Sequence, residues 1–135
     1  MSTIVPIGAD GPEFERAAYT PAMRVGELVF VSGQVAMTDD GQTLAVGDFK
    51  AQGDIAFQRL SEVLRKSGSD LSQVVKVTIF LTDRDFFPDL VELRKKWFSA
   101  PYPADSTVVV KSLVREECLI EIEAVALVSS ADVGE

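Results

Sequence analysis

The chain has 135 residues, 47% of them hydrophobic and 25% charged, which is enough to form one globular domain with its own core. Its 13 basic and 21 acidic residues give a net charge of -8, so a phosphate backbone is an unfavourable partner and we expect no nucleic-acid binding. It has no histidine and one cysteine, which argues against a histidine-dependent triad or a zinc site within one chain, and we expect no metal and no other cofactor.

The cysteine count and the start of the chain bear on the cellular compartment. Cys118 is the single cysteine, so the chain cannot form an internal disulfide. No signal peptide opens the sequence, and its apolar runs are shorter than the roughly 20 residues of a membrane helix. We therefore expect a cytoplasmic protein with no membrane partner.

The first part of the chain predicts a β-hairpin. Residues 1–16 contain several proline and glycine breakers and are expected to be irregular. Residues 19–24 and 28–34 have the composition of two strands, and Gly26 lies in the turn that joins them. Both faces of residues 28–34 begin apolar, so we expect this strand to be covered on both sides.

Two helices and a strand are predicted in the middle of the chain. Residues 49–67 have apolar side chains at helical spacing, with Asp48 as the N-cap and Gly68 as the residue that ends the helix. Residues 74–81 alternate as a strand, and residues 86–98 form the second helix. The strand is expected to present one fully apolar face, made of Val75, Val77, Ile79 and Leu81.

Two further strands, residues 106–111 and 118–128, precede a polar tail at 129–135 that we expect to fray. The resulting order ββαβαββ predicts a single α+β domain over residues 1–135, with both helices packed on one face of the sheet. The other face would keep its apolar residues uncovered, so we expect a partner subunit to cover it.

Gly33 and two glutamates are candidates for a site. A glycine inside a strand marks either a packing bulge or a position where another group approaches the backbone closely. Glu121 and Glu123 alternate with Ile120 and Ile122, so both carboxylates project from one face of the strand. Such a pair is typical of a solvated face. Beside apolar residues, however, a carboxylate would have a raised pKa and could hold a water or exchange a proton.

Three motifs stand out, namely Val-Phe-Val-Ser-Gly-Gln at residues 29–34, Pro-Ala-Asp-Ser at 103–106 and Ile-Glu-Ile-Glu-Ala at 120–124. With these motifs, residues 18–128 resemble the RidA family, whose members are also called YjgF or L-PSP proteins. It implies a chorismate-mutase-like fold and a homotrimer whose sheets form a central barrel, with the helices outside and clefts between subunits. It also implies that Glu121 is the catalytic residue and positions the attacking water. Adjacent chains would supply the substrate-binding residues of each cleft, which are Tyr19, Ser32, Gly33 and Asp105.

Asp105 departs from the pattern of the family's enamine/imine deaminases, which have an arginine at this position. That arginine would form a bidentate pair with a substrate carboxylate, whereas Asp105 would repel the carboxylate by about 4 kcal/mol at close range. The substitution therefore favours a neutral or amine-bearing substrate. Val91 and Arg94 also replace residues that are frequent on that wall in the family. A cation from elsewhere could compensate for Asp105, and the options are Arg24, Arg94, Lys111 and Arg115.

Three functions remain open from the sequence. The first is a diverged enamine/imine deaminase, or a related small-molecule hydrolase, that acts in a cleft between subunits. The second is a non-catalytic trimeric module that binds or senses a metabolite, with Asp105 holding an amine. The third is the ribonuclease label that the family sometimes carries, and it is the weakest because the chain is acidic and lacks histidine.

Overall fold

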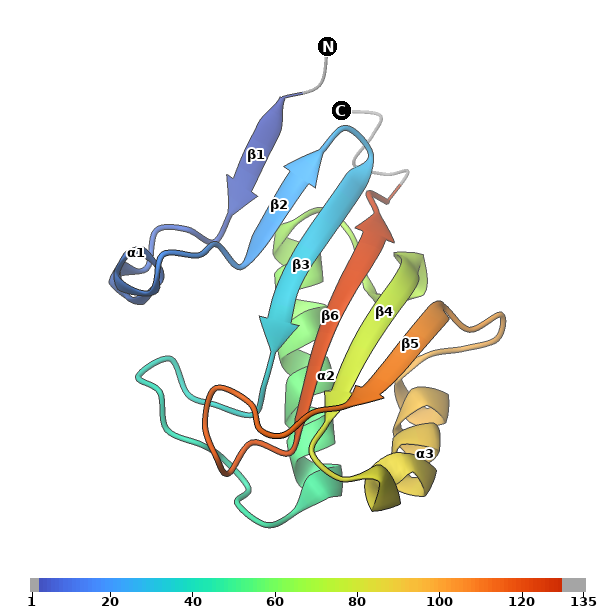
Figure 1. The fold of residues 1–135 in the computed structure, drawn as a ribbon. Coiled ribbons are helices and arrows are strands. Elements are labelled where there is room, and N and C mark those ends of the chain that lie inside the picture. Colours follow the sequence, from blue (N-terminus) through green and yellow to red (C-terminus); the bar gives the residue numbers. More distant parts are fainter. Residues whose placement is uncertain (1–2, 130–135) are drawn as a thin grey trace.

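The computed structural model describes residues 3–129, which form one β-sheet with the two longer helices on one of its faces (Figure 1). Besides α-helices and strands, it contains two short 3-10 helices, which are labelled η. In chain order the elements are β1 (Ile4–Ile7), α1 (Pro12–Ala17), β2 (Ala22–Val25), β3 (Leu28–Gln34), α2 (Phe49–Lys66), η1 (Leu71–Gln73), β4 (Val74–Leu81), η2 (Arg84–Phe86), α3 (Phe87–Trp97), β5 (Ala104–Val109) and β6 (Ile120–Leu127). The fold is α+β, as predicted.

The sheet has the strand order β1-β2-β3-β6-β4-β5. β4 and β5 pair in parallel, while β1–β2, β2–β3, β3–β6 and β4–β6 pair antiparallel. A parallel neighbour needs a crossover connection, and α3 lies in the connection between β4 and β5. The last strand, β6, consequently lies inside the sheet between β3 and β4 (Figure 1). From β2 onward the elements follow the predicted order ββαβαββ.

The prediction of an irregular segment over residues 1–16 is wrong, because this segment contains β1 and α1. β1 pairs with β2 at the edge of the sheet, where a strand tolerates Pro6 because one side makes no ladder hydrogen bonds. Pro12 starts α1, a position where its missing N–H costs nothing, and Ala18 ends the helix with φ 60°. The first strand of the hairpin then begins at Ala22, so Tyr19 lies in the connection before it.

The longest helix, α2, begins and ends where the sequence predicts. The Asp48 side chain accepts a hydrogen bond from the backbone N–H of Ala51, which satisfies one of the unpaired donors of the first turn. After Ser67 the chain leaves the helix at Gly68, whose φ of 82° is accessible to glycine at little cost. The residues that α2 buries include Ala56, Phe57, Leu60 and Leu64.

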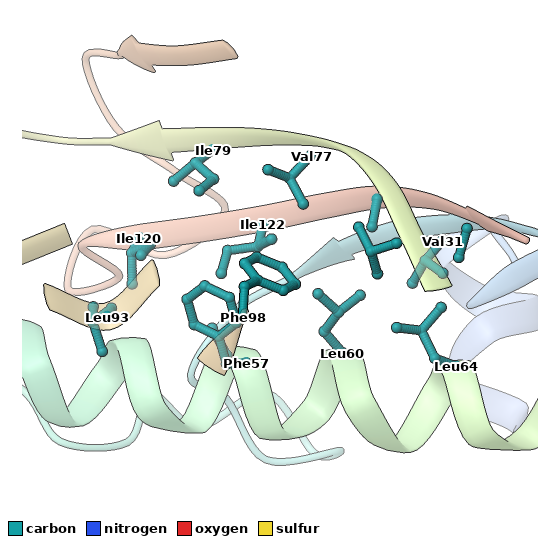
Figure 2. Close-up of a cluster of buried hydrophobic side chains, with 14 of the residues drawn as sticks. Val31, Phe57, Leu60, Leu64, Val77, Ile79, Leu93, Phe98, Ile120 and Ile122 are labelled. Carbon is teal, nitrogen blue, oxygen red and sulfur yellow. The ribbon is translucent and has the colours of Figure 1, made fainter. Parts of the chain in front are cut away.

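The hydrophobic core lies between the sheet and the two longer helices (Figure 2). Phe57 of α2 is fully buried and has its ring stacked on Trp97, with the centroids 5.8 Å apart and the planes 3° from parallel. A second aromatic neighbour is Phe98, whose ring packs edge-on against Phe57 with the centroids 5.4 Å apart. Figure 2 shows Phe57, Leu60 and Leu64 pointing from α2 toward the sheet. These contacts fix α2 against the strands that carry the candidate site residues.

β4 presents the predicted apolar face with one exception. Val77, Ile79 and Leu81 are buried, but Val75 is 44% exposed. The register of β4 against β6 shifts between Val74 and Lys76, which is the mark of a β-bulge. An extra residue in a strand reverses the side-chain alternation, so the prediction that Val75 belongs to the buried face is wrong.

Part of the sheet face opposite the helices is apolar and uncovered in one chain. Met23, Phe30 and Val125 are register neighbours on β2, β3 and β6, and Leu28 faces Leu127 beside them. Phe30 is 45% exposed. The second covered face predicted for β3 therefore requires a group from outside this chain.

The ends of the last two strands differ slightly from the prediction, since β5 spans 104–109 and β6 spans 120–127. After β6, the backbone N–H of Ser129 donates to the carbonyl of Gly68. The rest of the tail that we expected to fray, residues 130–135, lies outside the described residues. Within residues 3–129 no helix is long and apolar enough to cross a membrane.

Candidate active site

The carboxylate of Glu121 packs against the backbone of Gly33. β3 shifts register against β6 between Val31 and Gln34, so Ser32 and Gly33 form an irregular stretch of the strand. A Cβ atom placed on Gly33 would lie 2.6 Å from Cδ of Glu121, well inside the closest approach of two carbon atoms. Both interpretations of Gly33, the bulge and the close approach, therefore apply. The glycine leaves the space that the Glu121 carboxylate occupies.

Glu121 and Glu123 project from the same side of β6, away from the helices. The alternating residues Ile120 and Ile122 are fully buried on the helix side. Burial raises the pKa of Glu121, and the negative charge of Glu123 raises it further. This agrees with the sequence argument that a carboxylate among apolar residues should have a raised pKa. Glu121 is the partly buried member of the pair, whereas Glu123 is exposed.

A cavity of about 630 Å³ brings together three of the predicted site residues, Tyr19, Gly33 and Glu121. The Phe14 ring of α1 packs edge-on against Tyr19, with the centroids 5.2 Å apart, and holds the phenol at the cavity. A tyrosine with its ordinary pKa of 10.0 is protonated at neutral pH, and burial raises the pKa of Tyr19 further, so its hydroxyl can donate a hydrogen bond. Phe14 was missed from the sequence because α1 was not predicted.

Ser32, the neighbour of Gly33 in β3, is not among the residues that line this cavity. Its hydroxyl donates to the carbonyl of Thr20 at 2.5 Å, and its backbone N–H donates to the carbonyl of Pro21 at 2.9 Å. These two bonds tie β3 to the segment that follows Tyr19. In one chain, Ser32 therefore positions the phenol and the bulge, and its side chain is engaged with the backbone.

Asp105 lies on the other side of the sheet. It is the register partner of Val77, which is buried on the helix side, whereas Glu121 is the partner of Phe80. Residues opposite each other in register share a face, so Asp105 and Glu121 lie on opposite faces and β4 separates their strands. Asp105 lines a second cavity, of about 280 Å³, between α3 and the edge of the sheet.

Asp105 is paired with one of the four cations named from the sequence. Arg94 Nε lies 2.9 Å from Asp105 Oδ2, at an ion-pair distance but without the alignment of a hydrogen bond. The hydroxyl of Thr107 links the two, because it accepts from Arg94 Nη2 at 2.6 Å and donates to Asp105 Oδ1 at 2.7 Å. Thr107 was not singled out from the sequence, although a residue two positions after Asp105 on a strand must share its face.

The raised pKa of Glu121 predicts how stability depends on pH. The ionised carboxylate is disfavoured in the fold, so the cost is absent below the ordinary value of 4.5 and grows as the pH rises through the raised folded pKa. We expect Glu121→Gln to raise the melting temperature at pH 7 and to leave it nearly unchanged at about pH 4, measured by circular dichroism. Glu123→Gln, at the exposed neighbour, should give a smaller rise. A lower melting temperature of Glu121→Gln at pH 7 would contradict the argument.

Comparisons with known proteins agree on one family. The model of the family described as Endoribonuclease L-PSP matches residues 13–128. A 2-iminobutanoate/2-iminopropanoate deaminase from Dermatophagoides farinae is 34% identical over 110 residues, which are 82% of this chain and 85% of the relative. The human protein of the same name is 32% identical over 127 residues, 94% of this chain and 88% of the relative.

Solved structures give the same answer for the fold. Yeast Mmf1 superposes with a TM-score of 0.83 at 30% sequence identity, covering 94% of this chain and all of the other. A member of the YjgF/YER057c/UK114 family from Mycobacterium tuberculosis superposes with a TM-score of 0.80 at 28% identity, covering 93% of this chain and all of the other. The chain belongs to the RidA/L-PSP family, which confirms the resemblance seen in the sequence.

Proposed function

We propose that this protein is a small-molecule hydrolase of the deaminase type, which converts an imine or enamine into a carbonyl compound and ammonia. The observation that carries the proposal is the partly buried carboxylate of Glu121. It packs against Gly33, and it lines the same cavity as Tyr19. Relatives that are named deaminases support it. The reaction needs no redox change, and within residues 3–129 no group of three or more acidic or cysteine side chains could hold a metal ion.

The chemistry proposed for Glu121 is the activation of water. The ionised carboxylate takes a proton from water while the water oxygen attacks the imine carbon, and the C=N electron pair moves to nitrogen. The proton then passes to nitrogen, giving a carbinolamine. When the C–N bond breaks, the hydroxyl proton leaves with nitrogen, so that one imine and one water yield one carbonyl compound and one ammonia. The raised pKa of Glu121 makes it a better base than an ordinary glutamate once it is ionised.

We further propose that the working site lies between two copies of the chain in a homotrimer with a central barrel. Asp105 and Glu121 lie on opposite faces of one sheet, so a cleft that contains both must take them from different chains. The apolar face around Phe30 offers a surface for this assembly. The single cysteine, Cys118, is free and buried, which fits the reducing cytoplasm that we propose as its location.

The assembly predicts a particular mass in solution. Sedimentation equilibrium at micromolar concentration should give three times the chain mass of 14.7 kDa. Phe30→Asp should shift the distribution toward the single chain, because it puts a charge on the uncovered apolar face. Gln58→Asp, at an exposed position of α2 and outside this face, is the control for added charge. A single-chain mass for the natural sequence would rule out a cleft between copies.

A direct assay tests the reaction. Imines are generated in situ by an amino-acid oxidase from amino acids with short, aromatic or basic side chains, and ammonia and the oxo product are followed with and without the protein. Acceleration over buffer for at least one side-chain class is the expected result.

The second candidate, a non-catalytic binding module, is favoured by one observation, namely that Asp105 stands where the deaminases have an arginine. Thermal stabilisation by a metabolite, with no turnover of any imine, would support that candidate instead.

The charge of the substrate depends on how Asp105 is paired. Taken alone, Asp105 predicts a neutral or amine-bearing substrate, because it would repel a carboxylate. Arg94 supplies an opposite charge at 2.9 Å, so the argument from a free anion at this position loses its basis. The preference between anionic and cationic substrates then depends on what else Arg94 can bind.

A further inference from the structure

We propose that Arg94 is the residue with which this protein binds a carboxylate, and that Asp105 and Thr107 orient it for that purpose. The inference deepens the proposed function, on which it rests for its link to catalysis. It concerns the cavity of about 280 Å³ between α3 and the sheet edge. Arg94 reaches that cavity from α3, whereas the arginine expected from the family resemblance would come from β5.

The guanidinium of Arg94 is held from three sides. Asp105 lies beside Nε, Thr107 accepts a hydrogen bond from Nη2, and the Phe87 ring lies 5.4 Å from Cζ. The side chains of Arg94 and Asp105 are only 22% and 19% exposed, so the pair is less screened than an ion pair on the surface. A guanidinium fixed in this way loses little conformational freedom when a ligand binds.

Arg94 retains donors for a second anion. A guanidinium has five N–H groups, of which one faces Asp105 and one donates to Thr107. Both hydrogens of Nη1 and one of Nη2 have no partner among residues 3–129. One hydrogen from each of these two nitrogens forms the fork that matches a carboxylate with two parallel hydrogen bonds. The cavity lining also includes Lys95, so its charged residues carry two positive charges against the one negative charge of Asp105.

The rest of the lining defines the class of ligand. Val77, Val91, Phe98 and Pro103 are apolar, and Tyr102 adds an aromatic ring. A volume of about 280 Å³ holds only a small molecule. The ligand that fits this chemistry is a short monocarboxylate with a small apolar side chain, such as a 2-oxo or 2-imino acid with a few carbon atoms.

Binding of a stable 2-oxo acid tests the inference without turnover. The probe is 2-oxobutanoate, with its neutral methyl ester as the comparison, and the measurement is isothermal titration calorimetry on the full chain. We expect the acid to bind more tightly than the ester. Arg94→Gln should weaken binding of the acid by roughly ten-fold or more and leave the ester unchanged, because a charged hydrogen-bonded pair is lost. Arg94→Lys keeps the charge without the fork and should give an intermediate affinity.

Two variants separate direct contact from other effects. Lys95→Gln removes the same charge from the same cavity and should weaken acid binding much less than Arg94→Gln. Thr107→Val removes the orienting hydroxyl at similar volume, and should weaken the acid but not the ester, with no change in melting temperature. That selectivity would not follow from a merely structural role. If Arg94→Gln does not fold, the acid-to-ester ratio of Arg94→Lys decides the question.

The outcomes distinguish this inference from the proposed function. Equal affinities of the natural protein for acid and ester, or equal effects of Arg94→Gln and Lys95→Gln, would overturn the role of Arg94. Imine turnover could still be measured in that case. Conversely, Arg94-dependent binding of the acid in a protein that turns over no imine would support the inference and defeat the deaminase proposal. Glu121→Gln should keep the affinity for the acid while losing turnover. It is therefore the variant with which both the binding data and the turnover data are compared.

Discussion

Glu121→Gln should lower the rate of ammonia release by about 10²–10⁴-fold, with a smaller change in KM, because it removes the base that activates water. Glutamine has nearly the size of glutamate and can keep the packing of the side chain against Gly33, so substrate binding should persist. In the natural protein the rate should fall as the pH drops through the raised pKa of Glu121, where the carboxylate gains its proton. The measurement is the dependence of kcat and of kcat/KM on pH for both proteins.

Glu123→Gln is the matched control for this experiment. Glu123 projects from the same strand face two residues away, and it adds to the raised pKa of Glu121 by like-charge repulsion. Its replacement should therefore shift the acid limb of the rate profile to lower pH and leave the maximal rate within a few-fold. Comparable losses from both substitutions would mean that the face acts through its total charge, and Glu121 would lose its assigned role.

Phe57→Ala should cost about 3–5 kcal/mol of unfolding free energy, a large part of the roughly 5–15 kcal/mol that a domain possesses. Phe57 is fully buried and its ring contacts both Trp97 and Phe98, so alanine would leave a void between α2, α3 and the sheet. The rings around that void cannot collapse into it without moving α3. We expect a cooperative but much lower denaturant midpoint, or a chain that does not fold at 37 °C.

The size of this effect is checked by chemical denaturation at one fixed protein concentration, since assembly raises apparent stability by mass action. Phe57→Leu retains most of the volume and should cost about 1.5 kcal/mol or less. Val46→Ala, at a residue that is 65% exposed, should change stability by no more than about 0.5 kcal/mol. A small loss for Phe57→Ala would show that the aromatic cluster adapts, contrary to close packing.

Local signals explain which elements the sequence predicts well. α2 is bounded by Asp48 and Gly68, two residues whose effects act within one turn, and its bounds are accurate to one residue. β1 and α1 were missed for the opposite reason. A four-residue strand is stabilised only by pairing with β2, and a six-residue helix capped by no side chain carries no strong local signal. The exposure of the Val75 side chain likewise depends on the register of β4 against β6.

In the candidate site, too, the features with a local sequence signal could be predicted, and those that depend on tertiary packing could not. Gly33 and Glu121 could each be singled out as candidates, because a glycine inside a strand and a glutamate in an alternating strand are visible in the sequence, but their contact depends on the pairing of β3 with β6. The pairing of Arg94 with Asp105 depends on how α3 crosses from β4 to β5, which no local pattern specifies. The sequence supplied four possible cations for Asp105, and only the packing of α3 selects Arg94.

The position of β6 also constrains how the chain is made. Within residues 3–129, β6 follows all the other strands and yet fills the gap between β3 and β4, so the sheet stays in two separate pieces until residues 120–127 have emerged. Before that point a nascent chain exposes two unpaired strand edges of the kind that recruit other chains. The sheet therefore becomes continuous only once β6 has been made, and Glu121 arrives with the strand that joins its two parts.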